Sequence, residues 1–217
     1  MFSSHQELIE HLWQKGTISS LQVKELMLKI NRKDFVVKSE EAFRDKPSQI
    51  GFGATISAPH MHAWALEKLK DHILDKTVLD VGSGSGYLCV AFAELGAQKV
   101  VGIDHVPQLV EMSIQNISKN YKHYLDTNKV SFVCGDARHT LLREFDVIHV
   151  GAGCEEIPVD LLGMLKCGGR LIAPVGVSEN QKMTIVDKDF EGGVSVQNEM
   201  SVRYIPLTEL SVQCPNL

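Results

Sequence analysis

The chain has 217 residues, of which 44% are hydrophobic and 23% charged, and its formal net charge is −5. These proportions are close to globular averages and exclude disordered, collagen-like and coiled-coil classes. The negative balance does not supply the positive field that draws proteins to phosphate backbones or anionic membranes, so we expect neither nucleic acid nor a membrane as a partner.

The cysteines and the first residues indicate a reducing compartment. Five cysteines are scattered and none are spaced Cys-x-x-Cys, which predicts reduced core thiols rather than a disulfide framework or a zinc ribbon. The N-terminus has no basic stretch followed by an apolar run, and no apolar run approaches the roughly 18 residues of a bilayer span. We therefore expect a cytosolic protein.

Two helices are predicted at the start of the chain. Ser4-x-x-Glu7 and Ser19-x-x-Gln22 match the capping box, and apolar residues follow each at helical spacing. Residues 31–58 look irregular and contain Pro47, Gly51 and Gly53, with Pro59 directly after them. Because a long connection in a compact domain is more often functional than idle, we predict a binding loop there.

From Thr77 onward, short β-branched runs alternate with helical patterns, which is typical of a parallel α/β sheet. The predicted strands are Thr77–Val81, Lys99–Asp104, Lys129–Cys134, Asp146–Val150 and Arg170–Val175. The predicted helices are Tyr87–Leu95, Pro107–Asn120 and Pro158–Leu165, with Gly96 and Gly168 as helix stops.

The last part of the chain predicts an antiparallel edge. Strands are expected at Lys182–Asp187 and Val194–Val202, joined by a turn through Gly192-Gly193, and at Arg203–Leu207. No internal repeat or linker interrupts the pattern. We therefore predict one domain over residues 1–217, in which N-terminal helices and a substrate loop (1–58) pack on an α/β core (59–217).

A glycine loop follows the first core strand. Residues 80–86 read Asp-Val-Gly-Ser-Gly-Ser-Gly and precede a helix, which is the context of a nucleotide-binding loop. The dinucleotide fingerprint requires a glycine where Tyr87 stands. The loop also lacks the Lys followed by Ser or Thr that a Walker loop requires. The spacing Gly82-x-Gly84-x-Gly86, with Asp80 ahead, resembles the S-adenosyl-L-methionine site of class I methyltransferases.

Two further acids stand at strand ends. Asp104 lies 22 residues beyond Gly82, where an acid can accept hydrogen bonds from a ribose diol. Asp136 ends the next strand, and the methyltransferase resemblance gives it the exocyclic amine of adenine. Each acid alone is typical of an ordinary turn. Three acids, Asp80, Asp104 and Asp136, each at the end of a predicted parallel strand, together predict a cofactor site.

The segment before the core resembles one particular family of class I methyltransferases. Residues 45–63 read Asp-Lys-Pro-Ser-Gln-Ile-Gly-Phe-Gly-Ala-Thr-Ile-Ser-Ala-Pro-His-Met-His-Ala. They resemble the Pro-Gln-x-Ile-Gly-x-x-x-Thr-Ile-Ser-Ala-Pro-His-Met stretch of protein L-isoaspartate O-methyltransferases. Further matching segments are Asp80–Gly86, Gly102–His105, Ile148–Ala152, Gly168–Arg170 and Pro206–Thr208. The chain departs from the family at Ser48, which stands between Pro47 and Gln49. It departs again after the fourth strand, where the family has an alanine-rich turn and residues 151–156 read Gly-Ala-Gly-Cys-Glu-Glu.

The resemblance implies a fold and an activity. The implied fold is Rossmann-like, with a mostly parallel sheet flanked by helices, antiparallel C-terminal strands and an N-terminal helical addition. The implied enzyme transfers a methyl group from S-adenosyl-L-methionine to the free α-carboxyl of L-isoaspartyl residues in damaged proteins and peptides. S-Adenosyl-L-homocysteine is the product, and the ester permits succinimide formation and partial return to L-aspartyl. Acceptance of D-aspartyl residues stays open, and we expect a monomer.

The resemblance also assigns residues. The family's active-site serine corresponds to Ser57. The implied cofactor-binding residues are Ile56, Ser57, Ala58, Pro59, His60, Asp80, Gly82, Gly84, Gly86, Asp104, His105, Asp136, Ala137, Thr208 and Gln213. No metal is expected, because His60 and His62 face different sides of a helix and no Cys or acid completes a ligand set.

Ser57 fits the chemistry that the resemblance implies. A carboxylate acceptor, with a reference pKa of about 4, is already a nucleophile at neutral pH and needs no general base. A neutral hydroxyl can orient it without the ground-state stabilisation that a Lys or Arg would add. From the residues alone, the favoured interpretation of Ser57 is the cap of a helix that begins near Pro59. The resemblance favours catalytic positioning instead, and the two roles are compatible.

Two alternatives remain open. One is a class I methyltransferase with another acceptor. Amino-group enzymes on nucleic acids usually carry Asp/Asn-Pro-Pro-aromatic after the fourth strand, whereas residues 151–154 read Gly-Ala-Gly-Cys. The other is a non-catalytic adaptor that binds altered protein ends. Such relatives have long C-terminal extensions and this sequence stops at Leu217, so the enzyme is the favoured hypothesis.

Overall fold

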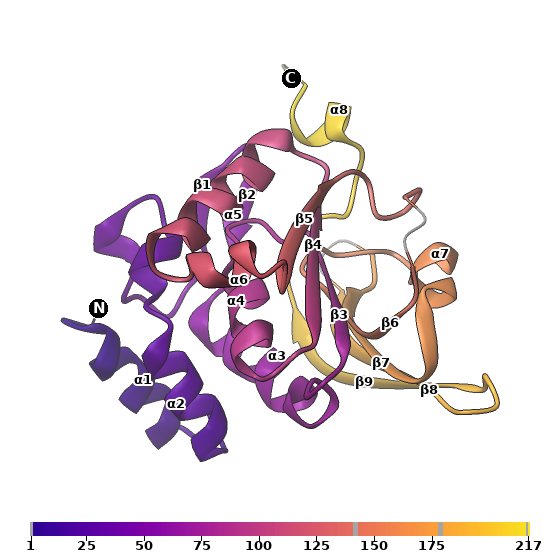
Figure 1. The fold of residues 1–217 in the computed structure, drawn as a ribbon, viewed down its shortest axis with the longest axis horizontal. Helices are drawn as coiled ribbons and strands as arrows, with labels where there is room; N and C mark the ends of the chain where they lie inside the picture. Colours follow the sequence, from indigo (N-terminus) through magenta and orange to yellow (C-terminus); the bar gives the residue numbers. More distant parts are fainter. Residues whose placement is uncertain (1, 141–142, 178–179, 216) are drawn as a thin grey trace.

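A seven-stranded sheet forms the centre of the molecule (Figure 1). The computed structural model describes residues 2–140, 143–177, 180–215 and 217. The strand order is β5-β4-β3-β6-β7-β8-β9, in which the first five strands are parallel and β8 and β9 are antiparallel to their neighbours. The predicted α/β fold with an antiparallel edge is confirmed.

The elements have the following bounds. The strands of the sheet are β3 (Thr77–Val81), β4 (Lys99–Asp104), β5 (Val130–Cys134), β6 (Phe145–Val150), β7 (Leu165–Val175), β8 (Gln181–Lys188) and β9 (Val194–Val202). The helices are α1 (His5–Gln14), α2 (Leu21–Lys29), α3 (Pro59–Leu69), α4 (Tyr87–Glu94), α5 (Pro107–Asn120), α6 (Lys122–Asp126), α7 (Val159–Gly163) and α8 (Leu210–Gln213). Short 3-10 turns lie at Arg32–Phe35, Ser39–Glu41 and Lys70–His72.

Two apolar clusters cover the two faces of the sheet. The larger one joins side chains of α1 to α5 to one face, and the smaller one joins strand residues to α7 on the other. Figure 1 shows α1 to α6 on one side of the sheet and α7 on the opposite side. Strand β3 is buried along its whole length, which explains why every residue in it except Asp80 is β-branched or apolar, with no alternation of polar residues.

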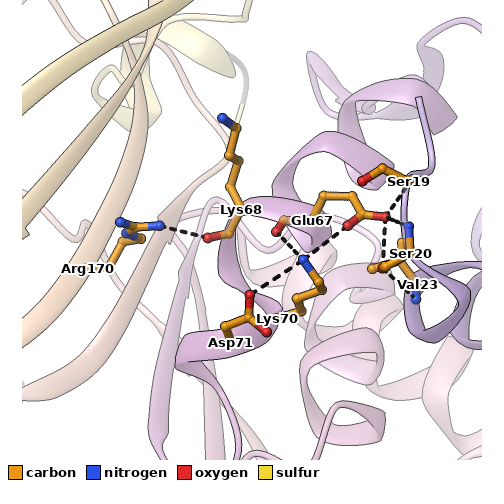
Figure 2. A network of polar contacts seen from close by, with 8 residues as sticks. All are labelled: Ser19, Ser20, Val23, Glu67, Lys68, Lys70, Asp71 and Arg170. Carbon is orange, nitrogen blue, oxygen red and sulfur yellow. Dashed lines mark hydrogen bonds and ion pairs between the residues drawn. The ribbon is translucent and has the colours of Figure 1, made fainter. Parts of the chain in front are cut away.

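The N-terminal helices begin at serine caps. The Ser4 hydroxyl accepts the Glu7 amide at 3.1 Å, which confirms the first predicted cap. The second prediction was wrong by one residue, because Ser20 rather than Ser19 caps α2. In Figure 2, the Glu67 carboxylate of α3 accepts the amides of both serines, each at 2.8 Å, and also the Ser20 hydroxyl, which in turn accepts the Val23 amide as the cap.

The segment predicted to be irregular contains a hairpin. Strands β1 (Ser48–Gly51) and β2 (Ala54–Ile56) pair antiparallel with a register shift at Gly51. Residues 51–53 all have positive φ, so the chain reverses where glycines flank Phe52. The prediction failed here because the strands are very short and their apolar residues do not alternate.

Two predictions near the C-terminal edge were wrong. Gly168 does not stop a helix, because α7 ends at Gly163 and Gly168 lies within β7. Residues 203–207 form no strand. They follow an extended path in which the Gly153 amide donates to Ile205 O at 2.8 Å and the Leu207 amide donates to Gly153 O at 2.6 Å. These bonds hold the segment over the end of the sheet.

The cysteines match their prediction only in part. All five are free, but Cys134 and Cys167 are exposed rather than in the core. Within the described ranges, none of the helices is long and apolar enough to cross a membrane.

Candidate active site

A cavity of about 470 Å³ opens at the carboxyl ends of the parallel strands. Four parts of the chain line it: the hairpin and the residues leading into α3, the glycine loop, the ends of β4 to β6, and the C-terminal segment. Ten predicted site residues line this cavity: Ser57, Ala58, Gly82, Gly84, Asp104, His105, Asp136, Ala137, Thr208 and Gln213. Its volume is in the range of small-molecule sites.

The glycine loop has a backbone that favours glycine. Gly82, Gly84 and Gly86 have φ values of 69°, 53° and 83°, a region that other residues adopt at a cost. Helix α5 holds the loop from behind, because the Ser113 hydroxyl donates to Gly84 O at 2.8 Å and the Asn116 amide donates to Ser85 O at 3.1 Å. The loop is therefore fixed before any ligand binds.

Asp104 connects the glycine loop to the end of β4. Its Oδ2 accepts the Gly84 amide at 3.1 Å and its Oδ1 accepts the Val106 amide at 3.1 Å. Burial raises the pKa of this carboxyl, and the two backbone donors oppose that rise. Since a carboxylate has about four acceptor sites, capacity remains for a diol presented from the cavity.

Ser57 lines the cavity just before α3, and it does not cap that helix. The N-cap is Ala58, whose side chain makes no capping bond, and Pro59 occupies the first turn. Asp45 replaces the missing cap, because its Oδ1 accepts the His60 amide at 3.0 Å and contacts the His60 ring at 2.8 Å. Ser57 instead lines the cavity together with Tyr204. The capping interpretation of Ser57 was wrong.

Comparison with known proteins identifies the family. The model of the protein-L-isoaspartate(D-aspartate) O-methyltransferase family matches residues 3–212. The protein-L-isoaspartate O-methyltransferase of Triticum aestivum is 44% identical over 212 residues, covering 95% of this chain and 92% of that protein. The Caenorhabditis elegans enzyme of the same name is 38% identical over 217 residues, covering 97% and 95%. The chain belongs to the protein-L-isoaspartate O-methyltransferase family.

A solved structure of this family supports the same fold and cofactor. The Plasmodium falciparum protein, crystallised with S-adenosyl-L-homocysteine, superposes with a TM-score of 0.87 at 30% identity and covers 95% of this chain and 99% of its own. The family uses S-adenosyl-L-methionine. The cavity fits that cofactor, since it combines a rigid glycine cradle with a buried carboxylate that has free acceptor capacity.

Asp136 lines the cavity, but Arg138 already engages its carboxylate. The Arg138 guanidinium donates from Nε to both oxygens at 3.0 and 3.2 Å and from a terminal nitrogen to Oδ2 at 2.6 Å. Although partial burial opposes ionisation, the bonds from Arg138 outweigh it and lower the pKa of Asp136. Any adenine amine would therefore share this acid with Arg138.

Asp80 and Ile56 line a second, smaller cavity of about 30 Å³ that also contacts Ser57 and the glycine loop. The Asp80 carboxylate is buried, contacts His149 Nδ1 at 2.7 Å and accepts the Cys89 thiol at 3.2 Å. Burial raises the pKa of that thiol far above its usual value, so Cys89 is unreactive. The Asp80 carboxylate thus joins the end of β3 to β6 and α4, beside the glycine loop.

Three predicted cofactor residues line neither cavity: Pro59, His60 and Gly86. Pro59 begins α3 and His60 pairs with Asp45. Gly86 begins α4 in a left-handed conformation, and a Cβ there would lie 3.2 Å from Ser113 Cβ. The geometry gives all three a supporting role around the site. In the described part of the chain, no group of His, Cys, Asp and Glu residues could hold a metal ion.

The C-terminal segment closes one side of the cavity. Gln213 contacts His105 Nε2 at 2.9 Å through its oxygen and donates from Nε2 to Phe52 O at 2.9 Å. One side chain of α8 therefore joins the end of β4 to the tip of the hairpin. Thr208 lines the same wall.

The sequence patterns missed three kinds of site residue. Tyr204 belongs to no recognisable motif, because its place in the cavity wall depends on the path of residues 203–207. Ser113 and Asn116 lie on a regular helix and act on the loop only through tertiary packing. The sequence offered one signal for Arg138: an Arg two residues after an Asp at a strand end can fold back and pair with that carboxylate.

Proposed function

We propose that this chain is a repair methyltransferase that methylates the free α-carboxyl of L-isoaspartyl residues in damaged proteins and peptides. Family membership over residues 3–212 carries this proposal. The cavity adds support, because it unites the glycine loop and Asp104 with Ser57 at one edge of the sheet. D-Aspartyl residues, which the family description includes, are proposed as further acceptors.

The residues of this chain suit transfer to an anionic oxygen. When bound, S-adenosyl-L-methionine supplies a methyl group on a sulfonium cation. The glycine loop and Asp104 would hold the amino-acid and ribose ends of the cofactor, and the Ser57 hydroxyl would orient the acceptor carboxylate by donating to it. No proton has to move, since a carboxylate is ionised at neutral pH. Positioning of cofactor and acceptor in the cavity is therefore the main contribution of the protein.

The decisive experiment compares an isoaspartyl peptide with its normal aspartyl twin. Transfer of a labelled methyl group is measured at saturating S-adenosyl-L-methionine, and we expect transfer only to the isoaspartyl peptide. Equal transfer to both peptides would contradict the proposed specificity. Binding of S-adenosyl-L-homocysteine without transfer to a panel of isoaspartyl peptides would favour an adaptor.

The role of Ser57 has its own test. Ser57→Ala removes a hydrogen-bond donor to a charged group, a contact worth about 1.5–3 kcal/mol, so we expect kcat/KM for the isoaspartyl peptide to fall about 10- to 100-fold. S-Adenosyl-L-homocysteine affinity, measured by calorimetry, is expected to change little. Ser118→Ala, on the exposed side of α5, serves as a matched control. Wild-type transfer by Ser57→Ala would exclude this role.

We propose further that the chain works as one methyltransferase domain and as a monomer in the cytosol, without a nucleic-acid or membrane partner. A continuous apolar cluster shared by α1 to α5 and the sheet supports a single domain. Five free cysteines support a reducing compartment, and the net charge of −5 argues against polyanionic partners. Light scattering combined with size-exclusion chromatography tests the monomer.

A further inference from the structure

Residues 203–207 form one wall of the cavity, and all of them line it. They follow β9, the strand at one edge of the sheet, and pass the turn that follows β6. The groups that would hold the cofactor lie elsewhere, because the glycine loop follows β3, Asp104 ends β4 and Asp136 follows β5 at the opposite edge. Residues 203–207 therefore line the half of the cavity that is left for the acceptor.

Two residues that line neither cavity, Gly153 and Gln181, hold this wall through its main chain. The Tyr204 amide donates to Gln181 Oε1 at 2.6 Å, and Gln181 Nε2 makes a longer bond of 3.4 Å to Tyr204 O. The Gly153 amide donates to Ile205 O at 2.8 Å, and the Leu207 amide donates to Gly153 O at 2.6 Å. These bonds fix the path of the wall without using any of its side chains.

The Gln181 side chain needs a glycine at position 153. A Cβ there would lie 2.2 Å from Gln181 Nε2 and 2.8 Å from its Cδ, so an alanine would push the amide aside. Gln181 is only 3% exposed, so a displaced amide could not exchange its lost bonds for bonds to water. The φ of Gly153 is not positive, so its lack of a side chain matters rather than its backbone conformation. Gly153 also lies in the turn where the sequence departs from the family's alanine-rich pattern.

We propose that Gly153 and Gln181 act together as positioning residues, which set the place of the wall formed by residues 203–207 and so align an isoaspartyl peptide with the methyl group. This inference rests on the proposed function and adds two residues that do not line the cavity. Methyl transfer requires the reacting atoms to lie about 3–3.5 Å apart in the correct direction, so a shift of the wall by about 1 Å is enough to impair it.

A double-mutant cycle tests the proposal. The kcat and KM for an isoaspartyl peptide are measured at saturating S-adenosyl-L-methionine for wild type, Gly153→Ala, Gln181→Ala and the double variant. Loss of the acceptor for the Tyr204 amide predicts a fall in kcat/KM of about 5- to 30-fold for each single variant, mainly through a higher peptide KM. In the Gln181→Ala background, the shortened side chain leaves room for Ala at position 153. Gly153→Ala is therefore expected to add less than about a twofold effect there.

Two further measurements separate positioning of the acceptor from other roles. S-Adenosyl-L-homocysteine affinity is expected to stay within about twofold of wild type, because α5 holds the glycine loop independently of this wall. A parallel fall in that affinity and in activity would assign the wall to the cofactor and overturn the proposal. A lower melting temperature with unchanged kcat and KM would give the pair a purely structural role and overturn it as well.

Each substitution has a matched control. An added Cβ at Gly163 would meet nothing within 4 Å, and Gln197 is exposed on β9, so Gly163→Ala and Gln197→Ala are expected to behave like wild type. Gly153→Ala displaces the Gln181 amide without removing it, so it carries the test by itself if Gln181→Ala does not fold.

The remaining outcomes are also distinct. An active wild type with multiplicative effects of the two substitutions, or with a Gly153→Ala variant of full activity, would overturn the proposal for this pair alone. A wild type that transfers no methyl group to isoaspartyl peptides would overturn the proposed function, and the role of the pair with it.

Discussion

The carboxylate of Asp104 holds the glycine loop and faces the cofactor cavity at the same time. Its exposed fraction is only 7%, and its oxygens accept the Gly84 and Val106 amides. Because burial raises the pKa of this group, its ionised form is costly to maintain in the folded protein. Such a cost is typical of groups that a ligand requires in one protonation state.

Asp104→Asn is expected to weaken S-adenosyl-L-homocysteine binding about 10-fold or more, because the amide has one acceptor oxygen and no charge. In the wild type, affinity is expected to fall on acidification at a higher pH than an ordinary aspartate would produce, since the raised pKa is crossed first. Calorimetry between pH 7 and pH 5 measures both effects.

The matched control is Asp71→Asn, whose side chain is 77% exposed and lies outside the cavity. It is expected to follow the wild-type pH profile. An Asp104→Asn variant that binds as tightly as wild type at pH 7 would show that Asp104 serves only the loop.

At the scale of elements, the start of α3 explains how Ser57 can remain available. A helix leaves its first amides without partners, and a side chain usually satisfies them from the N-cap. Here Asp45 accepts the His60 amide from outside the helix. Burial opposes ionisation of Asp45, but the bonds from the His60 ring and amide outweigh it and lower its pKa.

Asp45→Ala is expected to lower the free energy of unfolding by about 1 kcal/mol at pH 7, as loss of a cap usually does. A folded-state pKa below the unfolded one contributes stability above the unfolded pKa, near 3.9, and loses it as the pH falls through the folded value. The difference from wild type should therefore shrink below about pH 4. Urea unfolding at several pH values measures it.

Asp71→Ala is the control for Asp45→Ala and is expected to leave stability unchanged, because its side chain is largely in solvent. Equal stability of Asp45→Ala and wild type at neutral pH would mean that solvent caps α3 as well as Asp45 does.

At the scale of the whole molecule, Glu67 joins the N-terminal helix pair to the catalytic core. Its Oε1 accepts the amides of Ser19 and Ser20 and the Ser20 hydroxyl, while Lys70 pairs with the same carboxylate (Figure 2). Apolar contacts of α1 and α2 continue into the core cluster. The helix pair therefore depends on both a polar and an apolar attachment.

Glu67→Ala is expected to lower the free energy of unfolding by about 1–3 kcal/mol, because amides at the start of α2 lose their acceptor. Hydrogen exchange should accelerate in α1 and α2 more than in the central strands. Glu25→Ala, on the exposed face of α2, is the control and should exchange like wild type. Uniform acceleration across the sheet would show that the helix pair and the core open together.

Local patterns predicted the elements whose signals lie within a few residues. Strands β3 and β4 and helix α5 have the expected bounds, because a buried β-branched run and a proline-started amphipathic stretch each carry their own information. The last predicted strand failed for a tertiary reason. Residues 203–207 have extended backbone, but their partners are the Gly153 backbone and the Gln181 side chain rather than a neighbouring strand.

The sequence by itself determined the fold class, the glycine loop with its in-phase acids, and the family. These features depend on spacing along the chain, which strand and helix geometry converts directly into position. Only the tertiary structure decided how each side chain is used: Asp45 caps α3, Arg138 engages Asp136, and Gln213 joins His105 to Phe52. Such pairings join residues far apart in the chain or on irregular segments, where no period constrains direction, so they exist only once the chain has packed.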